Sequence, residues 1–168
     1  MALPIQQTKT LTNRPQCAAS QGVTLRTWTG SDDIHSWLNI RNSAFAEQDS
    51  AIKPWRMEDF ERVFLRKPWW QPERMWFAEI CDENGQPRSV GSITWGESGL
   101  GQRKTQTVQW LAVLPEWRGQ GIGRILLTNL EAACWDAGHR EIRLETLSTW
   151  EAAMRLYLAA GYKPADNR

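Results

Sequence analysis

The chain has 168 residues, a length typical of one domain, with 20 basic and 19 acidic side chains and a net charge of +1. So small a net charge gives no electrostatic argument for a nucleic acid or an anionic membrane surface as a partner, and it favours a small ligand. Three cysteines without a CxxC pair, and only two histidines, argue against a metal site and a disulfide framework. They indicate reduced, mostly buried thiols in the cytoplasm.

The first 22 residues lack the apolar stretch of a signal peptide, and no later run is long and apolar enough to span a membrane. We therefore expect no membrane association. Residues 1–22 are predicted to form a flexible arm, and residues 23–168 the folded domain.

The first half of the domain predicts strands and helices in alternation. Residues 23–28 alternate as a half-buried strand does, Ser31 can cap a helix through about residue 45, and a second helix is expected over residues 54–65. Strands at residues 75–81 and 88–95 flank an Asn84-Gly85 hairpin turn, and a third strand covers residues 106–114. Three antiparallel strands in a meander are the economical interpretation.

The second half predicts a crossover. A helix is expected from the glycines near residue 121 to Ala137, a strand over residues 141–147, and a last helix opened by a Ser148 and Glu151 capping box. A strand, helix, strand order requires a right-handed crossover and so a locally parallel pair. The predicted fold class is α+β, a mixed and mostly antiparallel sheet with one parallel crossover, flanked by helices.

Residues 115–124 read PEWRGQGIGR and place glycines at every second position where a helix begins. The first turn of a helix has unpaired N–H groups and a partial positive charge, and glycine lets an anion approach them closely. Arg118 and Arg124 can add charge-assisted contacts. Because residue 124 is arginine, GxGxxG fails, and the P-loop pattern has no match.

The spacing of Arg118, Gly121 and Gly123 fits [QR]xxGx[GA], and here the sequence resembles the GNAT superfamily of acyl-CoA-dependent N-acetyltransferases. Two further motifs support this resemblance. LAVLP precedes the glycines as an apolar-Val-x-Pro strand end, and residues 150–162 resemble the family signature NxxAxxLYxxxGF, with Trp150 in place of its asparagine.

The resemblance implies the GNAT fold, acetyl-CoA as acyl donor, and the following roles. The strand Leu111, Ala112 and Val113 would contact the pantetheine arm through its main chain. The pyrophosphate would bind Arg118, Gly119, Gln120, Gly121, Ile122, Gly123 and Arg124. Trp150 would lie at the cofactor, and Tyr157 would be the general acid that protonates the departing thiolate. No metal is implied.

A narrower resemblance, to the mycothiol synthase members of the family, covers IRNSAFA, WRMEDF and VGSITW in the first half. Those enzymes have two GNAT domains in tandem. The resemblance predicts one such domain here, with too few residues after Tyr162 for the usual closing strands, so how the sheet closes stays open. By alignment on LAVLP, their glutamate base falls at Thr107.

Threonine cannot serve as the base, and neither can Gln109 two residues later. The proton of the amine would leave through Glu47, Asp49 or Glu79, or along a water chain. The predicted function is acetyl transfer to a primary amine of a small molecule or peptide. The alternatives are a non-catalytic acyl-CoA-binding module or sensor and, from the 11 tryptophans, a carbohydrate-binding module. A homodimer is left open.

Overall fold

The computed structural model describes residues 2–17, 20, 22–46, 52–99, 101 and 103–165. Within them the chain forms one seven-stranded sheet in the order β2-β3-β4-β5-β6-β1-β7. The strands are β1 Pro4–Thr10, β2 Thr24–Thr27, β3 Met75–Cys81, β4 Pro87–Ser98, β5 Thr105–Val113, β6 Glu141–Leu147 and β7 Lys163–Pro164. The helices are α1 Asp32–Ala46, α2 Met57–Phe60 with the π-helical turn η1 Glu61–Leu65, α3 Ile122–Asp136 and α4 Glu151–Ala159, and 3₁₀ turns occur at η2 Pro72–Arg74 and η3 Pro115–Trp117.

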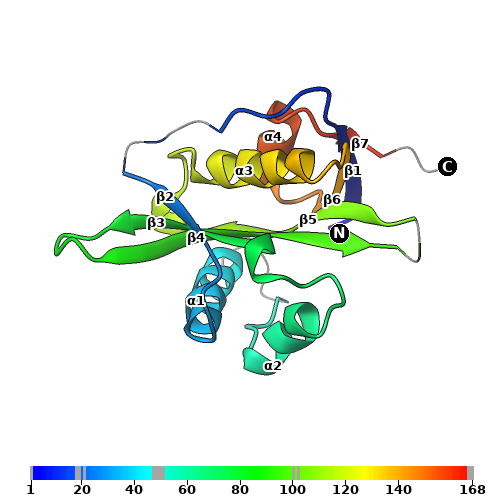
Figure 1. Ribbon diagram of the computed structural model, residues 1–168. Helices are drawn as coiled ribbons and strands as arrows, with labels where there is room; N and C mark the ends of the chain where they lie inside the picture. The colour runs from blue at the N-terminus through cyan, green and yellow to red at the C-terminus, as the bar shows by residue number, and fades with distance from the viewer. Residues whose placement is uncertain are drawn as a thin grey trace.

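The sheet lies between two layers of helices, with α1 and α2 on one face and α3 and α4 on the other (Figure 1). Strands β2 to β5 form an antiparallel meander, and β5 pairs with β6 in parallel through the α3 crossover. The predicted mixed sheet with one parallel crossover is therefore confirmed. Leu126, Leu127 and Leu130 of α3 are fully buried against it.

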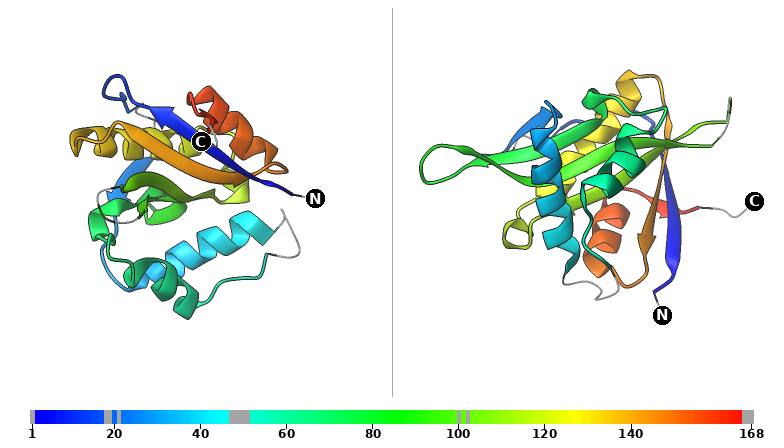
Figure 2. Two further views of the ribbon diagram at one scale, coloured as in Figure 1. Left: turned by 90° about the vertical axis from the view of Figure 1, so that its right-hand side faces the viewer. Right: turned by 90° about the horizontal axis from the view of Figure 1, so that it is seen from below.

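The prediction that residues 1–22 form a flexible arm is wrong for residues 4–10. These residues form β1, which pairs antiparallel with all seven residues of β6, from Pro4 opposite Leu147 to Thr10 opposite Glu141. The two strands lie side by side in both views of Figure 2. On its other edge β1 pairs with the two-residue strand β7. The N-terminal strand β1 thus continues the sheet beyond β6, and the two-residue strand β7 forms its edge. This arrangement supplies the closing strands that the sequence analysis left open.

Two local predictions are also corrected. The expected capping box at Ser148 does not form, because Trp150 is the N-cap residue of α4 and the Ser148 hydroxyl accepts a hydrogen bond from the Leu3 N–H (3.1 Å). The second helix begins at Met57, three residues after the predicted Pro54, and continues as a π-helical turn.

The cysteines are not mostly buried as expected: Cys134 is buried, whereas Cys17 and Cys81 are exposed. Among the described residues, no cluster of histidine, cysteine or carboxylate side chains could hold a metal ion. None of the described helices combines the length and apolar character that crossing a membrane requires.

Candidate active site

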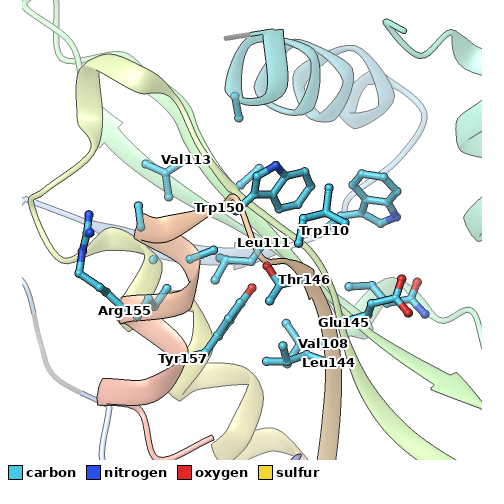
Figure 3. A pocket seen from close by; sticks show the side chains of 18 of the residues that line it. Val108, Trp110, Leu111, Val113, Leu144, Glu145, Thr146, Trp150, Arg155 and Tyr157 are labelled. Atoms are coloured by element: carbon cyan, nitrogen blue, oxygen red, sulfur yellow. The ribbon is translucent and has the colours of Figure 1, made fainter. Parts of the chain in front are cut away.

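A cavity of about 930 Å³ opens between β5, β6, the first turn of α3 and the start of α4. Figure 3 shows its labelled walls: Trp110 and Leu111 lie on the β5 side, Thr146 and Glu145 on the β6 side, and Tyr157 on α4. β5 lies far from β6 and α4 in the sequence, so the crossover through α3 is what brings them together.

The cavity exists because β5 and β6 diverge. Their parallel pairing is limited to Gln106 opposite Ile142 and Thr107 opposite Arg143, although β5 continues to Val113 and β6 to Leu147. Beyond Thr107 the edge of β5 that faces β6 therefore has no partner strand. An extended amide-containing ligand can pair with such an edge as an added strand would.

A β-bulge lies where the strands separate. In the ladder with β4, Thr94 pairs with Gln109 and Ser92 with Ala112, so β5 has one extra residue opposite Ile93. Trp110 occupies the bulge with φ 51°, the one non-glycine residue described with a positive φ. A left-handed conformation at a bulky residue is strained, and such residues are concentrated at functional sites.

The row of backbone amides at residues 119–124 has no hydrogen-bond partner among the described residues, and the first amide that does is Ile125, which donates to the Gly121 carbonyl (3.0 Å). Gly119 and Gly121 adopt left-handed φ values of 73° and 80°, which disfavour any side chain. Gly123 has ordinary φ, but a Cβ there would lie 3.3 Å from Leu156 of α4. The glycines thus present free amides at a helix N-terminus, which is a site for an anion.

The two arginines beside this row differ. Arg118 donates through Nη2 to the Ala44 carbonyl (2.7 Å) and through Nε to the Val113 carbonyl (3.3 Å), so it joins the end of α1 to the end of β5. Arg124 is exposed at the cavity and has no hydrogen bond or ion pair with a described residue. Arg124 is therefore the arginine whose charge is available to a bound anion.

Tyr157 is 7% exposed, lines the cavity, and packs edge-on against Tyr162 with ring centroids 5.8 Å apart. Burial raises the pKa of the Tyr157 hydroxyl above its usual value near 10. The hydroxyl therefore stays protonated at neutral pH, as a proton donor to a leaving group must be.

The carboxylate at the cavity is one that the sequence analysis missed. Glu145 is the only acidic side chain among the described residues that line it, and it accepts a hydrogen bond from Gln6 of β1. The sequence EIRLETL could have indicated Glu145. Arg143 pairs with Thr107, and Glu145 is two residues after Arg143, so both side chains lie on the same face of β6.

The other candidate bases fare differently. Thr107 and Gln109 line the cavity, and Gln109 donates to the Thr107 hydroxyl (3.2 Å). Glu79 lies outside the cavity lining and is paired with Arg26 (2.5 Å). Glu47 and Asp49 lie outside the described residues.

Two polar groups in the cavity wall are buried without a partner among the described residues: the Thr146 hydroxyl and the Trp150 indole N–H. Buried polar groups are normally hydrogen-bonded. Unpaired ones in a cavity wall therefore suit a ligand with amide and hydroxyl groups, such as a pantetheine arm. Of the residues that the resemblance implied, all line the cavity except Gln120, which is exposed outside it.

Comparison with known proteins agrees with this arrangement. The acetyltransferase (GNAT) family profile matches residues 34–162. A protein named mycothiol acetyltransferase from Mycobacterium marinum is 29% identical over 178 residues, covering 94% of this chain and 52% of its own length. The chain thus spans about half the length of the curated relatives it matches.

Solved structures share the fold. A GCN5-related N-acetyltransferase from Sphaerobacter thermophilus superposes with a TM-score of 0.77 and 22% identity, covering 96% of this chain and 48% of that one. A structure of the NatC complex bound to Gag peptide and CoA aligns with a TM-score of 0.63 and 22% identity, covering 83% of this chain and 84% of that one.

The fold and the family match together define the class of protein to which this chain belongs. The chain belongs to the acetyltransferase (GNAT) family. The predicted family and fold are confirmed.

Proposed function

We propose that this chain transfers the acetyl group of acetyl-CoA to a primary amine of a small molecule or peptide by direct attack. The observation that carries the proposal is that one cavity is lined by Gly119 and residues 121–124 with their free amides, by the unpaired edge of β5, and by Tyr157 and Glu145. The free amides would bind a pyrophosphate, and the strand edge would bind a pantetheine arm. Tyr157 would be the proton donor and Glu145 the proton acceptor.

The donor would lie along β5. The free amides and Arg124 suit the pyrophosphate, and the main chain of Leu111, Ala112 and Val113 suits the arm. An N–H group near the bulge would hydrogen-bond the thioester oxygen and stabilise the negative charge that develops on it during attack.

The acceptor would lie on the Glu145 side of the cavity. An alkylammonium with a pKa near 10 must lose a proton before it attacks, which costs about 4 kcal/mol at pH 7. Glu145 would accept that proton, directly or through water, and the hydrogen bond from Gln6 would hold the carboxylate in place. This assigns to β6 the role that a glutamate at position 107 would otherwise perform.

Tyr157 would complete the reaction. When the carbon–sulfur bond breaks, the sulfur leaves as a thiolate, and the buried hydroxyl would donate its proton to it. A raised pKa makes Tyr157 a weak acid. We therefore expect a hydrogen bond to the sulfur to form first and the proton to move late.

Only the comparisons with known proteins suggest which acceptor amine is used. The names of the relatives suggest the amine whose acetylation gives mycothiol, and the NatC structure suggests a peptide amine. Exposed Cys17 and Cys81 suit a reducing compartment, so we place the reaction in the cytoplasm.

The test has two readouts. Calorimetry should show saturable binding of acetyl-CoA to the wild-type chain. Release of free CoA thiol should then require an added amine, screened over small amines and peptide N-termini. A chain that binds acetyl-CoA but releases no thiol with any amine would contradict the catalytic proposal and leave a second candidate, the acyl-CoA-binding module, which Thr107 at the position of the usual glutamate favours.

A further inference from the structure

A second cavity, of about 650 Å³, lies between α1, residues 52–56 and the start of α2. Its charged lining consists of Arg41, Lys53, Arg56 and Asp59. The carboxylate of Asp59 is already occupied, since it accepts from the Arg56 N–H (3.0 Å) and from Arg62 (3.0 Å). The lining therefore carries an excess of positive charge.

Arg41 is the unusual member. It is 3% exposed, yet among the described residues no carboxylate lies within ion-pair distance of it. Its Nη1 donates to Asn42 (3.0 Å) and to the Lys53 carbonyl (2.9 Å), Nε has no partner, and Nη2 donates to no described residue. Burying a cation is costly, and burial lowers the pKa of Arg41, an effect that the more distant carboxylate of Asp59 offsets only in part.

Stacking on three aromatic rings attracts the cation but supplies no negative charge. The guanidinium carbon lies 4.6 Å from the centroid of the Trp55 ring, 5.1 Å from Trp110 and 5.6 Å from Phe45. Trp55 is also held in place without Arg41. The Asn42 side chain accepts a hydrogen bond from the Trp55 N–H (2.9 Å) and donates one to the Trp55 carbonyl (3.0 Å). The tether between α1 and residues 53–55 uses only Nη1 of Arg41, so Nη2 is left over for a ligand.

The two cavities share a wall. Trp55 lines the second cavity and Trp110 the first, and their rings lie 4.6 Å apart. Arg41 stacks on both rings. A group bound at Arg41 is therefore separated from the acetyl-transfer cavity by little more than this pair of indoles.

We propose that the second cavity binds an anionic group, a carboxylate or a phosphate, through Arg41 and Lys53, and that this group belongs to the acceptor amine. The assignment to the acceptor rests on the proposed acetyl transfer, whereas the anion site does not. The acceptor would then be a zwitterion in solution, with its amine in the first cavity and its anion in the second.

Calorimetric titration with succinate and with inorganic phosphate, at constant ionic strength, tests the site directly. We expect saturable binding of at least one of the two, and the better probe identifies the class of anion. Lys53→Gln and Arg41→Met should each weaken it about tenfold or more, since a hydrogen bond to a charged group is lost. Arg66→Gln, which removes an exposed charge outside the cavity, should leave it unchanged.

A thermal melt shows whether Arg41→Met folds, and if it does not, Lys53→Gln decides, because Lys53 is exposed at the cavity and its main chain is unaltered. The proposal is overturned if neither probe saturates the wild-type chain, or if Lys53→Gln and Arg66→Gln bind with wild-type affinity.

Kinetics test the assignment to the acceptor. Amino carboxylates from glycine to 6-aminohexanoate are compared with their amides, and the ratio of kcat/KM between acid and amide is measured in each variant. In Lys53→Gln the ratio should fall about tenfold, and in Arg66→Gln it should not change. An unchanged ratio in Lys53→Gln refutes the acceptor role even if succinate binds. Failure of every amine contradicts acetyl transfer, while the titration still decides the site.

Discussion

At the scale of single residues, the hydroxyl of Tyr157 is buried at the point where the acetyl-CoA sulfur is expected, and its pKa is raised. Tyr157→Phe should lower kcat by about 10²–10⁴ while the affinity for CoA stays nearly unchanged, because only the proton donor is removed. The rate of CoA thiol release at saturating substrate gives kcat, and calorimetry gives the affinity for CoA.

Tyr162→Phe is the matched control, since Tyr162 is buried against Tyr157 but lies outside the cavity lining. It should turn over as the wild type does. Wild-type turnover of Tyr157→Phe on a proven amine would rule out the acid role.

Glu145 and Thr107 make a pair of opposite tests. Glu145→Gln should lower kcat/KM below the pKa of the amine, where the ammonium form dominates, and the loss should shrink as the pH approaches that pKa. Thr107→Glu should raise kcat/KM in the same pH range, and should partly restore Glu145→Gln, because it returns a carboxylate to the cavity.

The measurement is a pH profile of kcat/KM for the wild type, Glu145→Gln, Thr107→Glu and the double variant. If the profile of Glu145→Gln is that of the wild type, the proton leaves by another route, such as water to bulk solvent.

Gly121 tests the anion site with a control of equal strain. Gly121→Ala and Gly138→Ala both place a methyl group in open space at a left-handed residue, with φ 80° and 88°. Each should lower the free energy of unfolding by about 1–2 kcal/mol. Only Gly121→Ala should weaken CoA binding in calorimetry, because only Gly121 belongs to the row of free amides. Equal CoA affinity in the two folded variants would remove the pyrophosphate assignment.

At the scale of elements, β2, α1 and β3 are joined by charge. Arg26 of β2 donates to both oxygens of Asp33 in α1 (2.8 and 2.9 Å) and is paired with Glu79 of β3. Burial would raise the pKa of Asp33, but the hydrogen bonds from Arg26 and Thr29 outweigh it and lower the pKa. The stabilisation is therefore present above pH 4 and is lost as the pH falls below it.

Asp33→Asn should cost about 1.5–3 kcal/mol at pH 7 and should flatten the decline in stability below pH 4. Urea unfolding from pH 2.5 to 7 measures both effects. The matched control, Asp32→Asn, removes an exposed carboxylate from the same helical turn and should change neither. A wild-type slope in Asp33→Asn would show that other carboxylates cause acid unfolding.

The sequence predicted those elements whose signals are local. EIRLETL alternates buried and exposed positions, so the bounds of β6 were predicted as observed. The bounds of β3 were also predicted as observed, although MWFAEIC is buried at four successive positions and does not alternate. PIQQTKT was missed because its buried position is occupied by Gln7, and the strand is specified by hydrogen bonds to residues 141–147. The residues expected at the cofactor were named from a motif, and all but Gln120 line the cavity, whereas Glu145 became a candidate only once β6 was seen to diverge from β5.

At the scale of the whole molecule, an ion pair connects the N-terminal strand β1 to the helix layer that contains α3. Lys9 of β1 pairs with the buried Glu131 of α3 (2.8 Å). Lys9→Met should destabilise the chain by about 3–5 kcal/mol, because it leaves Glu131 as an uncompensated buried charge. Lys9→Met with Glu131→Gln should recover most of the loss. Thermal or urea unfolding of the wild type, Lys9→Met, Glu131→Gln and the double variant forms the cycle. Hydrogen exchange should show reduced protection of β6 amides in Lys9→Met alone.

The pairing of β1 with β6 also has a consequence for biosynthesis. Strands β2 to β5 lie between β1 and β6 in the sequence, so β1 leaves the ribosome well before residues 141–147, with which it pairs. Pairing at such sequence separation is slow, and β1 must wait unpaired until β6 emerges. The polar composition of PIQQTKT then has a use of its own, because a strand that waits in solvent is less prone to aggregate when it carries few apolar side chains. The pairing of β1 with β6 therefore cannot form before residues 141–147 have left the ribosome.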